Sequence, residues 1–600
     1  MRRIALFAAL APLLLAALSC TAPQKKAELP PAAPAAQVQG RVDAKNAGKK
    51  RLMIVGINDT HGALLAIPPP KHVSGVTKQD IGGADWFGGW VNAIRNEYKE
   101  EGGQVVVLDA GDEFQGTLIS NQFLGKSVVD AYNLIGVTAS AIGNHEFDFG
   151  LPALKDRMAQ AKYPLLAANI FKKGTQERPE WAKPSILIDQ GGIKIGIIGL
   201  ATVETPLTTN TNNIEGLDFV EGGPVAAKEA ELLRAQGATV VLITAHAGPF
   251  PPDNEIQHIA EACKGKVDAI VSGHHHTAIK TPLIVANIPI VQSGSKLQAF
   301  STIELTLDSS NHAIEYAVND GATPVDAAPQ AILHTFNGLP AQFRGHTVSA
   351  DARITTMLEG YDSQVKQLRE SKIGESATEL RKGGKDDLLA NLATDAMRSG
   401  AGGGLKANFA FQNSGGLRVS EIPPGPITFG QIFDLYPFDN QQVVVSLPAK
   451  EVRNALEAVL HSGKGPLRVS GLRYTIDWNK YDAAKNLKDA PWGSIVTEVV
   501  DEATGKPLCE TKGCSLTECT STCEQGTFTV AVTDFLANGG DGLNMLKEAP
   551  KKVGSTNARD IIVAFIKAHQ PLTPELLGSV TKGAKPRIVQ NGTAVRPQAD

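Results

Sequence analysis

Five short apolar runs in the first half of the chain each end in a polar motif that carries histidine, aspartate or asparagine. The runs span residues 51–57, 104–108, 138–142, 238–244 and 267–272. Runs of this length, bounded by glycine or polar residues, are typical of buried β-strands. Because ligands of open α/β sheets bind beyond the carboxyl ends of the strands, we expect all five motifs at the same edge of one sheet.

The motifs combine the side chains that a phosphoesterase with two metal ions requires. They read Asn-Asp-Thr-His-Gly at 58–62, Asp-Ala-Gly-Asp-Glu at 109–113, Gly-Asn-His-Glu at 143–146, Ala-His-Ala-Gly at 245–248 and Gly-His-His-His at 273–276. Such a mixture of imidazole, carboxylate and amide groups suits Zn²⁺ or Mn²⁺. Two ions about 3.5–4 Å apart can bind a nucleophile and a phosphoryl group together. Asp112 is the best candidate for a bridging carboxylate, while Asp59 and His61 alternate along the chain and can reach one ion.

Each motif alone has an ordinary structural explanation. A solvated loop accounts for a single Asp-x-His or His-x-His, His275 is interpreted as a neighbour in a polar loop, and Asn58 as a turn cap. The five motifs share chain order, strand context and ligand chemistry, which together favour a metal site over a purely structural role.

These motifs resemble the calcineurin-like metallophosphoesterase superfamily and, within it, the bacterial 5′-nucleotidase / UDP-sugar hydrolase family. The resemblance implies an α/β fold: an N-terminal four-layer α/β/β/α domain followed by a second α+β domain that binds substrate. It also implies two divalent metal ions. One would be held by Asp59, His61, Asp112 and His276, and the other by Asp112, Asn144, His246 and His274. His145 and Asp148 resemble the catalytic dyad of the family: His145 would stabilise the transition state or protonate the leaving oxygen, and Asp148 would hold its tautomer.

The second half of the chain carries motifs that bear on the substrate. They are Phe-Gln-Asn-Ser-Gly-Gly-Leu-Arg at 411–418, Tyr-Pro-Phe at 436–438 and Asp-Phe-Leu-Ala-Asn-Gly-Gly-Asp-Gly at 534–542. Taken alone, they read as turns and core phenylalanines. The family resemblance, which runs from about residue 51 to about residue 570, implies nucleotide binding instead. Asn413, Gly416 and Arg418 would lie on the phosphate and ribose side, Phe438 and Phe535 would stack on the base, and Asp541 would bind the ribose hydroxyls.

One region departs from the family pattern. Arg381 is expected to contact phosphate, but its spacing to Asn391 is longer than in relatives, so Lys385 is the alternative contact. Lysine offers a point charge where arginine offers a two-pronged donor, and the substrate preference therefore stays open here.

The N-terminus predicts export. Arg2 and Arg3 precede an apolar stretch from residue 4 to 18 and then Cys20, a pattern typical of a bacterial signal peptide with a lipidation site. We expect residues 1–20 to be the signal and lipobox, 21–50 a flexible tether, 51–345 the metallophosphoesterase domain, 346–374 a linker helix, 375–575 the nucleotide-binding domain and 576–600 a tail. The expected location is the periplasm or the outer membrane of a bacterium, with membrane attachment only through the lipid at Cys20. Ordinary signal cleavage is the alternative.

Four further cysteines, Cys509, Cys514, Cys519 and Cys523, cluster in a polar segment. Export permits disulfides, so two bridges of undetermined connectivity are preferred over a Cys₄ zinc site. Cys263 is expected to be a buried thiol.

Composition narrows the function classes. At 600 residues the chain needs at least two domains, and a net charge of −4 gives no sign of binding to a nucleic-acid polymer. The leading hypothesis is an exported phosphohydrolase that cleaves 5′-nucleotides to nucleoside and phosphate through attack by metal-bound hydroxide. The alternatives on the same site are a 2′,3′-cyclic nucleotide phosphodiesterase, a UDP-sugar or nucleoside diphosphate hydrolase, or a sulfur-ester hydrolase. A lipid-anchored binding protein is the non-enzyme alternative; the oligomeric state stays undetermined.

Overall fold

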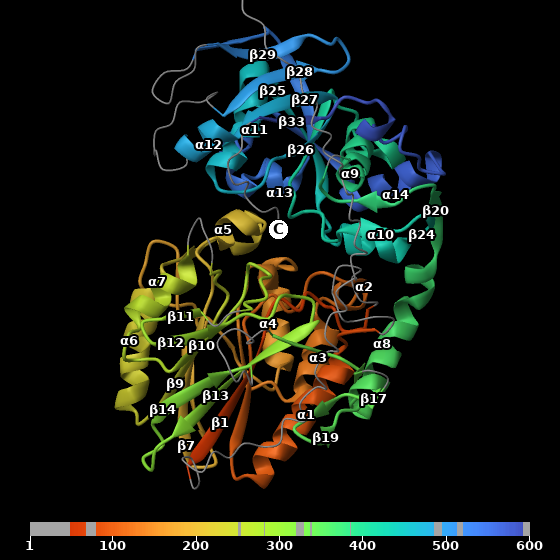
Figure 1. Cartoon of the computed structure of the whole chain (residues 1–600). Coiled ribbons are helices and arrows are strands. Elements are labelled where there is room, and N and C mark those ends of the chain that lie inside the picture. The colour runs from red at the N-terminus through yellow and green to blue at the C-terminus, as the bar shows by residue number, and fades with distance from the viewer. Residues whose placement is uncertain are drawn as a thin grey trace, which may run out of the picture. The chain divides into compact units, whose positions relative to one another are not determined.

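Two mixed β-sheets form the centre of the N-terminal half (Figure 1). The computed structural model describes residues 49–67, 80–249, 254–280, 283–319, 329–336, 339–384, 386–484, 495–512 and 520–591. The first sheet has the strand order β14-β13-β1-β2-β3-β4, with β15 paired to β13, and the second has the order β11-β12-β10-β9-β7-β6.

The strands of the first sheet are β1 (Lys50–Ile57), β2 (Gln104–Asp109), β3 (Ala139–Ala141), β4 (Leu165–Leu166), β13 (Ala299–Leu307), β14 (Ala313–Val318) and β15 (Gln330–Ala331). Those of the second are β6 (Ser185–Gln190), β7 (Ile193–Leu200), β9 (Val240–Ala245), β10 (Ala269–Ser272), β11 (Leu283–Val285) and β12 (Ile288–Val291). Within each sheet the strands that precede site motifs run parallel to one another, so their carboxyl ends lie at one edge.

Side-chain alternation along the strands explains the four layers. In β1, Leu52 and Ile54 pack between the two sheets against Ile195 and Ile197 of β7. The intervening Met53 and Val55 belong instead to a core with α1 (Ala84–Glu100) and α3 (Lys126–Ile135). On the other outer face, β7 and β9 pack against α6 (Gly222–Ala235) and α7 (Glu255–Ala262). Both faces of each sheet are thus covered, and the strands are apolar on both sides.

The expectation of a single sheet was wrong. The motifs after β1, β2 and β3 come from the first sheet, whereas those after β9 and β10 come from the second. The two sheets pack closely enough that a Cβ on Gly56 would lie 2.9 Å from a Val271 methyl group. All five motifs still meet, because the facing sheets present their carboxyl ends at the same end of the sandwich.

The C-terminal half is a second α+β domain with two five-stranded sheets. One has the order β26-β22-β31-β25-β32 and the other β30-β29-β28-β27-β33. Their strands are β22 (Phe409–Gln412), β25 (Gln441–Pro448), β26 (Arg468–Ser470), β27 (Leu472–Asp477), β28 (Val496–Asp501), β29 (Pro507–Lys512), β30 (Thr520–Cys523), β31 (Thr527–Thr533), β32 (Lys551–Asn557) and β33 (Ile588–Asn591). Helices α9 (Leu388–Ser399) and α14 (Ala558–Ala568) cover one face of the first of these sheets, and α11 (Ala449–His461) packs on the other.

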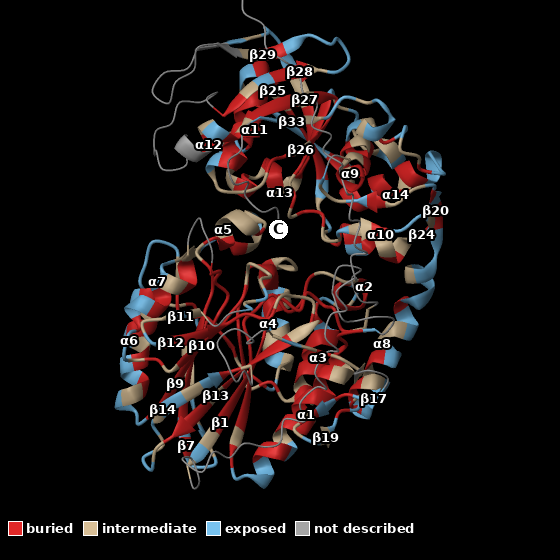
Figure 2. Ribbon diagram, viewed as in Figure 1, coloured by how far each residue is buried: buried red, intermediate tan, exposed pale blue. Residues whose placement is uncertain are grey.

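A long helix, α8 (Ala352–Glu370), leads into this domain. Exposed residues gather along it and along the outer side of α6, whereas buried residues concentrate in the strands (Figure 2). In the described part of the chain no helix has the length and apolar character needed to cross a bilayer.

The cysteine predictions are met in part. Cys509 and Cys523 form a disulfide between the paired strands β29 and β30. Cys514, Cys519 and Cys20 lie outside the described residues. Cys263 is a free, buried thiol, as expected.

Candidate metal centre and substrate pocket

Five of the seven predicted metal ligands have left-handed backbone conformation. The φ angles are 50° for Asp59, 49° for His61, 57° for Asp112, 77° for His274 and 50° for His276. Non-glycine residues rarely adopt this conformation, which costs on the order of 1–3 kcal/mol each and clusters at functional sites. The turns after the strands are therefore held in strained shapes that aim these side chains inward.

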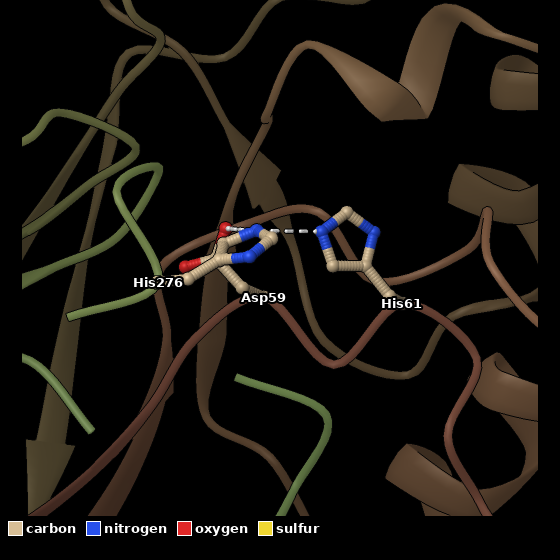
Figure 3. Close-up of side chains that lie close together, drawn as sticks. All are labelled: Asp59, His61 and His276. Carbon is tan, nitrogen blue, oxygen red and sulfur yellow. Dashed lines mark hydrogen bonds and ion pairs between the residues drawn. The ribbon is translucent and has the colours of Figure 1, made fainter. Parts of the chain in front are cut away.

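The first cluster consists of Asp59, His61 and His276 (Figure 3). The Nε2 atoms of His61 and His276 lie 2.9 Å apart, and His276 Nε2 lies 3.4 Å from Asp59 Oδ1. One ligand atom from each residue falls within 4.8 Å of the others. This donor set of one carboxylate and two imidazoles fits Zn²⁺ or Mn²⁺.

Asp112 lies between this cluster and a second one. Its Oδ2 atom is 3.8 Å from His61 Nε2 and 3.1 Å from His246 Nε2. His246 Nε2 is also 3.0 Å from the amide oxygen of Asn144. Asp112 thus contacts histidines of both clusters, the arrangement required of a bridging carboxylate.

Hydrogen bonds at Nδ1 of His61 and His246 determine which ring nitrogen of each faces the two clusters. His61 Nδ1 lies 2.8 Å from the carbonyl oxygen of Gln115, and His246 Nδ1 lies 2.8 Å from that of Ala110. A carbonyl oxygen only accepts, so Nδ1 of each ring donates to it, and Nε2 is the ring nitrogen that would bind an ion.

Neighbouring charges keep the Asp112 carboxylate, the candidate bridge, ionised. Burial alone would raise the pKa of Asp112, but His246 and His145 outweigh it and hold that pKa well below its ordinary value. Glu146, which the sequence interpretation did not single out, accepts hydrogen bonds from the backbone N–H groups of Asp112, Glu113 and Gly143. These bonds shape the loop that carries Asp112. A Cβ on Gly143 would lie 2.2 Å from Asp112 Oδ1, so only glycine fits there.

The two side chains of the predicted dyad lie in contact. His145 Nδ1 lies 2.6 Å from Asp148 Oδ2, and Thr209 donates to the other oxygen of Asp148. The backbone N–H of His145 donates to Asp112 Oδ1 at 2.9 Å, which fixes the dyad beside the candidate bridge. Because the Asp148 carboxylate accepts a hydrogen bond from His145 Nδ1–H, the other ring nitrogen of His145, Nε2, is left for a different partner.

A pocket of about 440 Å³ lies next to these groups, and residues of both domains line it. All the described residues belong to one compact unit of the chain. The predicted residues that line the pocket are Asp112, Asn144, His145, Asp148, His274, His276, Asn413, Gly416, Arg418, Phe438, Phe535 and Asp541.

Arg418 connects the substrate residues to the metal cluster. Its Nη2 donates to His61 Nε2 at 2.9 Å, and its guanidinium lies 5.9 Å from the centre of the Phe438 ring. The Phe438 ring in turn lies 5.8 Å from the ring of His145. Phe535 packs over Gly540, where a Cβ would lie within 2.4 Å of its ring.

The structure does not bring Arg381 to this pocket. Arg381 pairs with Glu379 and Glu421, at 2.9 and 3.4 Å, and its side chain is 59% exposed. Lys385 lies outside the described residues. His275 packs against Gly248 and lines the same pocket.

Glu204 and Lys464 are among the pocket residues that escaped the sequence interpretation. Glu204 follows the apolar strand β7 in the segment Ala-Thr-Val-Glu at 201–204, so the rule that found the other motifs would have found it too. Lys464 lies between two glycines in the second domain and carries no comparable signal.

The double β-sheet sandwich, with carboxylate–imidazole clusters at the carboxyl ends of its strands, defines a metallophosphoesterase carrying a second domain for its substrate. Comparison with family models gives the same result. Residues 52–278 match the calcineurin-like phosphoesterase model, and residues 364–548 match the 5′-nucleotidase C-terminal domain model. The chain belongs to the 5′-nucleotidase family of calcineurin-like phosphoesterases and is a phosphoester hydrolase. Membership of this family implies divalent metal ions.

Known proteins are similar over most of the chain. A cell wall protein of Listeria monocytogenes is 26% identical over 555 residues, which cover 83% of this chain and 64% of that protein. A snake venom 5′-nucleotidase of Gloydius brevicauda is 26% identical over 569 residues, or 89% of each chain. The crystal structure of a 5′-nucleotidase precursor from Thermus thermophilus superposes with a TM-score of 0.68 at 25% identity, covering 90% of this chain and all of the other.

Proposed function

We propose that this protein is an exported, metal-dependent 5′-nucleotidase that converts nucleoside 5′-monophosphates to nucleoside and phosphate. The observation that carries the proposal is the position of the Arg418 guanidinium of the second domain, whose Nη2 lies 2.9 Å from Nε2 of His61, a candidate metal ligand. This contact puts a phosphate-binding guanidinium at the metal cluster and a stacking ring, Phe438, beside the dyad histidine.

The candidate ligands fit two divalent ions. Asp59, His61, Asp112 and His276 would hold one ion, and Asp112, Asn144, His246 and His274 the other. Zn²⁺ and Mn²⁺ suit this donor set best. The chemistry that bound ions supply here is polarisation of the phosphoryl oxygens and neutralisation of their charge.

The remaining side chains have separate tasks. Arg418 would bind the phosphate with two parallel donors and orient it. His145, with its tautomer held by Asp148, would donate a hydrogen bond to the phosphoryl group or protonate the leaving 5′-oxygen. Phe438 and Phe535 would enclose the base, Asn413 and the Gly416 backbone would lie along the phosphate and ribose, and Asp541 would accept from the ribose hydroxyls.

Export is supported by the N-terminal pattern and by the similarity to a cell wall protein and a snake venom enzyme. We further propose lipid attachment at Cys20, which mass spectrometry of the mature N-terminus would test.

A substrate panel tests the proposed activity. Metal-stripped protein would be supplied with Zn²⁺, Mn²⁺ or Co²⁺ and given AMP, ADP, ATP, UDP-glucose, 2′,3′-cyclic AMP or an aryl phosphate. Metal-dependent release of phosphate from AMP, well above that from the aryl phosphate, is expected. Turnover of the other esters alone would overturn the nucleotidase assignment, and no turnover with any metal would favour a binding protein. The variant His145→Ala should lose turnover of AMP and retain nucleotide binding.

A further inference from the structure

The carboxylate of Glu204 joins a candidate metal ligand to the substrate domain. Glu204 is 7% exposed and precedes α5 (Thr205–Thr208). Its Oε2 atom lies 2.9 Å from His274 Nε2 and 2.8 Å from the ammonium of Lys464. One oxygen thus accepts from a histidine of the N-terminal domain and from a lysine of the C-terminal domain.

This contact determines the tautomer of His274. An ionised carboxylate only accepts, so the proton of the neutral imidazole is on Nε2 and the lone pair is on Nδ1. If His274 binds an ion, Nδ1 would be its ligand atom, whereas His61 and His246 would use Nε2. Its ring centre lies 5.0 Å from that of His246, on the side of the second cluster. The ring nitrogens of His61 and His246 that face away from the centre donate to backbone carbonyl oxygens. The corresponding nitrogen of His274 donates to a charged carboxylate, that of Glu204.

Glu204 is held in place by its own loop. Its backbone N–H donates to Thr202 Oγ1, and the Thr202 hydroxyl donates to Glu255. The backbone N–H of Val203 donates to the other oxygen of Glu255, and Thr208 donates to the Glu204 carbonyl. With the backbone fixed on both sides, the carboxylate has little freedom to leave His274, as a positioning role requires.

Lys464 reaches Glu204 from the turn that follows α11. Its backbone N–H donates to the carbonyl of Val459, and the preceding Ser462 donates to the carbonyl of Asp541. Asp541 is the candidate ribose ligand and has left-handed backbone, at φ 53°. A ligand that orders the Asp541 turn would therefore also order the turn that carries Lys464.

We propose that Glu204 is a positioning residue for the second metal ion and that Lys464 couples that ion to nucleotide binding. The proposal rests on the proposed function in taking His274 as a metal ligand and Asp541 as a nucleotide contact. Outer-shell carboxylates of this kind change metal affinity by about 10–100-fold. Because coupling between two binding sites is reciprocal, a nucleoside should tighten metal binding through Lys464.

Titration of metal-free protein with Co²⁺ tests the first part, by calorimetry together with the absorption spectrum of the bound ion. In Glu204→Gln the weaker of the two binding steps should lose about 10–100-fold in affinity and its spectrum should change, because the neutral amide removes the negative charge that makes the His274 imidazole a stronger ligand. The control Glu215→Gln removes an exposed carboxylate near the same loop and should bind Co²⁺ like the wild type.

His274→Ala separates the two ways in which this test can fail. If His274→Ala loses the weaker step and Glu204→Gln retains it, the role of Glu204 is overturned while the metal site stands. If neither variant loses affinity, His274 is not a ligand and the site assignment falls with the inference. Thermal unfolding of each metal-free variant establishes that it is folded.

The coupling is read by repeating the Co²⁺ titration with saturating adenosine. Adenosine should tighten the weaker step in the wild type and should have no such effect in Lys464→Met. Lys406→Met, which removes an exposed lysine of the same domain, is the control and should keep the coupling. An adenosine effect that survives in Lys464→Met would overturn the role of Lys464.

Discussion

Ligand residues with left-handed backbone explain how short turns converge on one centre. Asp59 and His61 are two residues apart and both have φ near 50°, so the chain curls instead of extending between them. The backbone N–H groups of Asp59 and His61 donate to the carbonyls of Gly111 and Asp112 on the neighbouring turn. The cost of the strained conformations is thus offset by hydrogen bonds between adjacent turns, which hold the candidate ligands in position.

Asp148→Asn tests the dyad at the level of a single atom. An amide can donate to His145 Nδ1 and thereby favour the wrong tautomer, without a change in shape. We expect kcat for AMP to fall by about 10²–10⁴-fold with little change in KM. Asp156→Asn, at an exposed position on the following helix, should leave both constants unchanged. Steady-state kinetics with a fall in kcat of less than tenfold would contradict the dyad.

Phe535→Ala tests stacking on the base. Loss of one stacking ring costs about 1–3 kcal/mol per base, so KM for AMP should rise by about fivefold or more. An aryl phosphate lacks the nucleobase, and its kcat/KM should stay within twofold of the wild type. Phe171→Ala removes a part-buried ring outside the pocket and provides the control. Equal losses on both substrates would mean that Phe535 supports the fold and not the base.

At the scale of elements, the apolar runs predicted the positions of the strands well, but they did not predict which strands share a sheet. The runs at 104–108 and 267–272 became β2 and β10, within two residues at each end. Their assignment to two different sheets could not be predicted. Strands that are buried on both faces lack the alternation of apolar and polar side chains that would show which face packs against which layer. Arg381 shows the same limit for the site: its distance from the pocket depends on the path of a short strand, β21 (Leu380–Arg381), which spacing along the sequence does not encode.

The start of α8 offers a stability test away from the site. Asp351 caps this helix by accepting from the Arg353 backbone N–H, and it also binds the side chains of Arg353 and Asn92. Asp351→Ala should lower the free energy of unfolding by about 1–2 kcal/mol. Glu359→Ala, exposed on the same helix, should change it by less than about 0.5 kcal/mol.

Acid should remove the same contribution from the wild type. The hydrogen bond from Arg353 lowers the pKa of Asp351 to about 2. A carboxylate with a lowered pKa stabilises the fold above its unfolded value of about 3.9, and the contribution is lost as pH falls toward 2. The difference in unfolding free energy between wild type and Asp351→Ala should therefore shrink between about pH 4 and 2. A difference that is constant over this range would contradict the assignment.

For the whole molecule, the candidate metal centre concentrates buried charge where the two domains meet. Arg418, Lys464 and Asn121 each donate a hydrogen bond from one domain to the other around the pocket. Asp59, Asp112 and several further carboxylates are almost fully buried in the N-terminal domain. Without cations, such carboxylates repel one another and pay for desolvation, so the fold itself should depend on bound metal.

Metal removal should accordingly destabilise the protein. An ion present at a thousand times its Kd adds about 4 kcal/mol of stability, and two ions add roughly twice that. Dialysis against a chelator should lower the melting temperature, and Zn²⁺, Mn²⁺ or Co²⁺ should restore it. Ca²⁺ at the same concentration should restore little, since it prefers an all-oxygen shell and four of the seven candidate ligands are histidines. Differential scanning calorimetry measures these shifts, and Asp112→Asn, which removes the candidate bridge, should lose most of the metal-dependent increase. An unchanged melting temperature after chelation would mean that the buried carboxylates are neutralised by protons and not by metal.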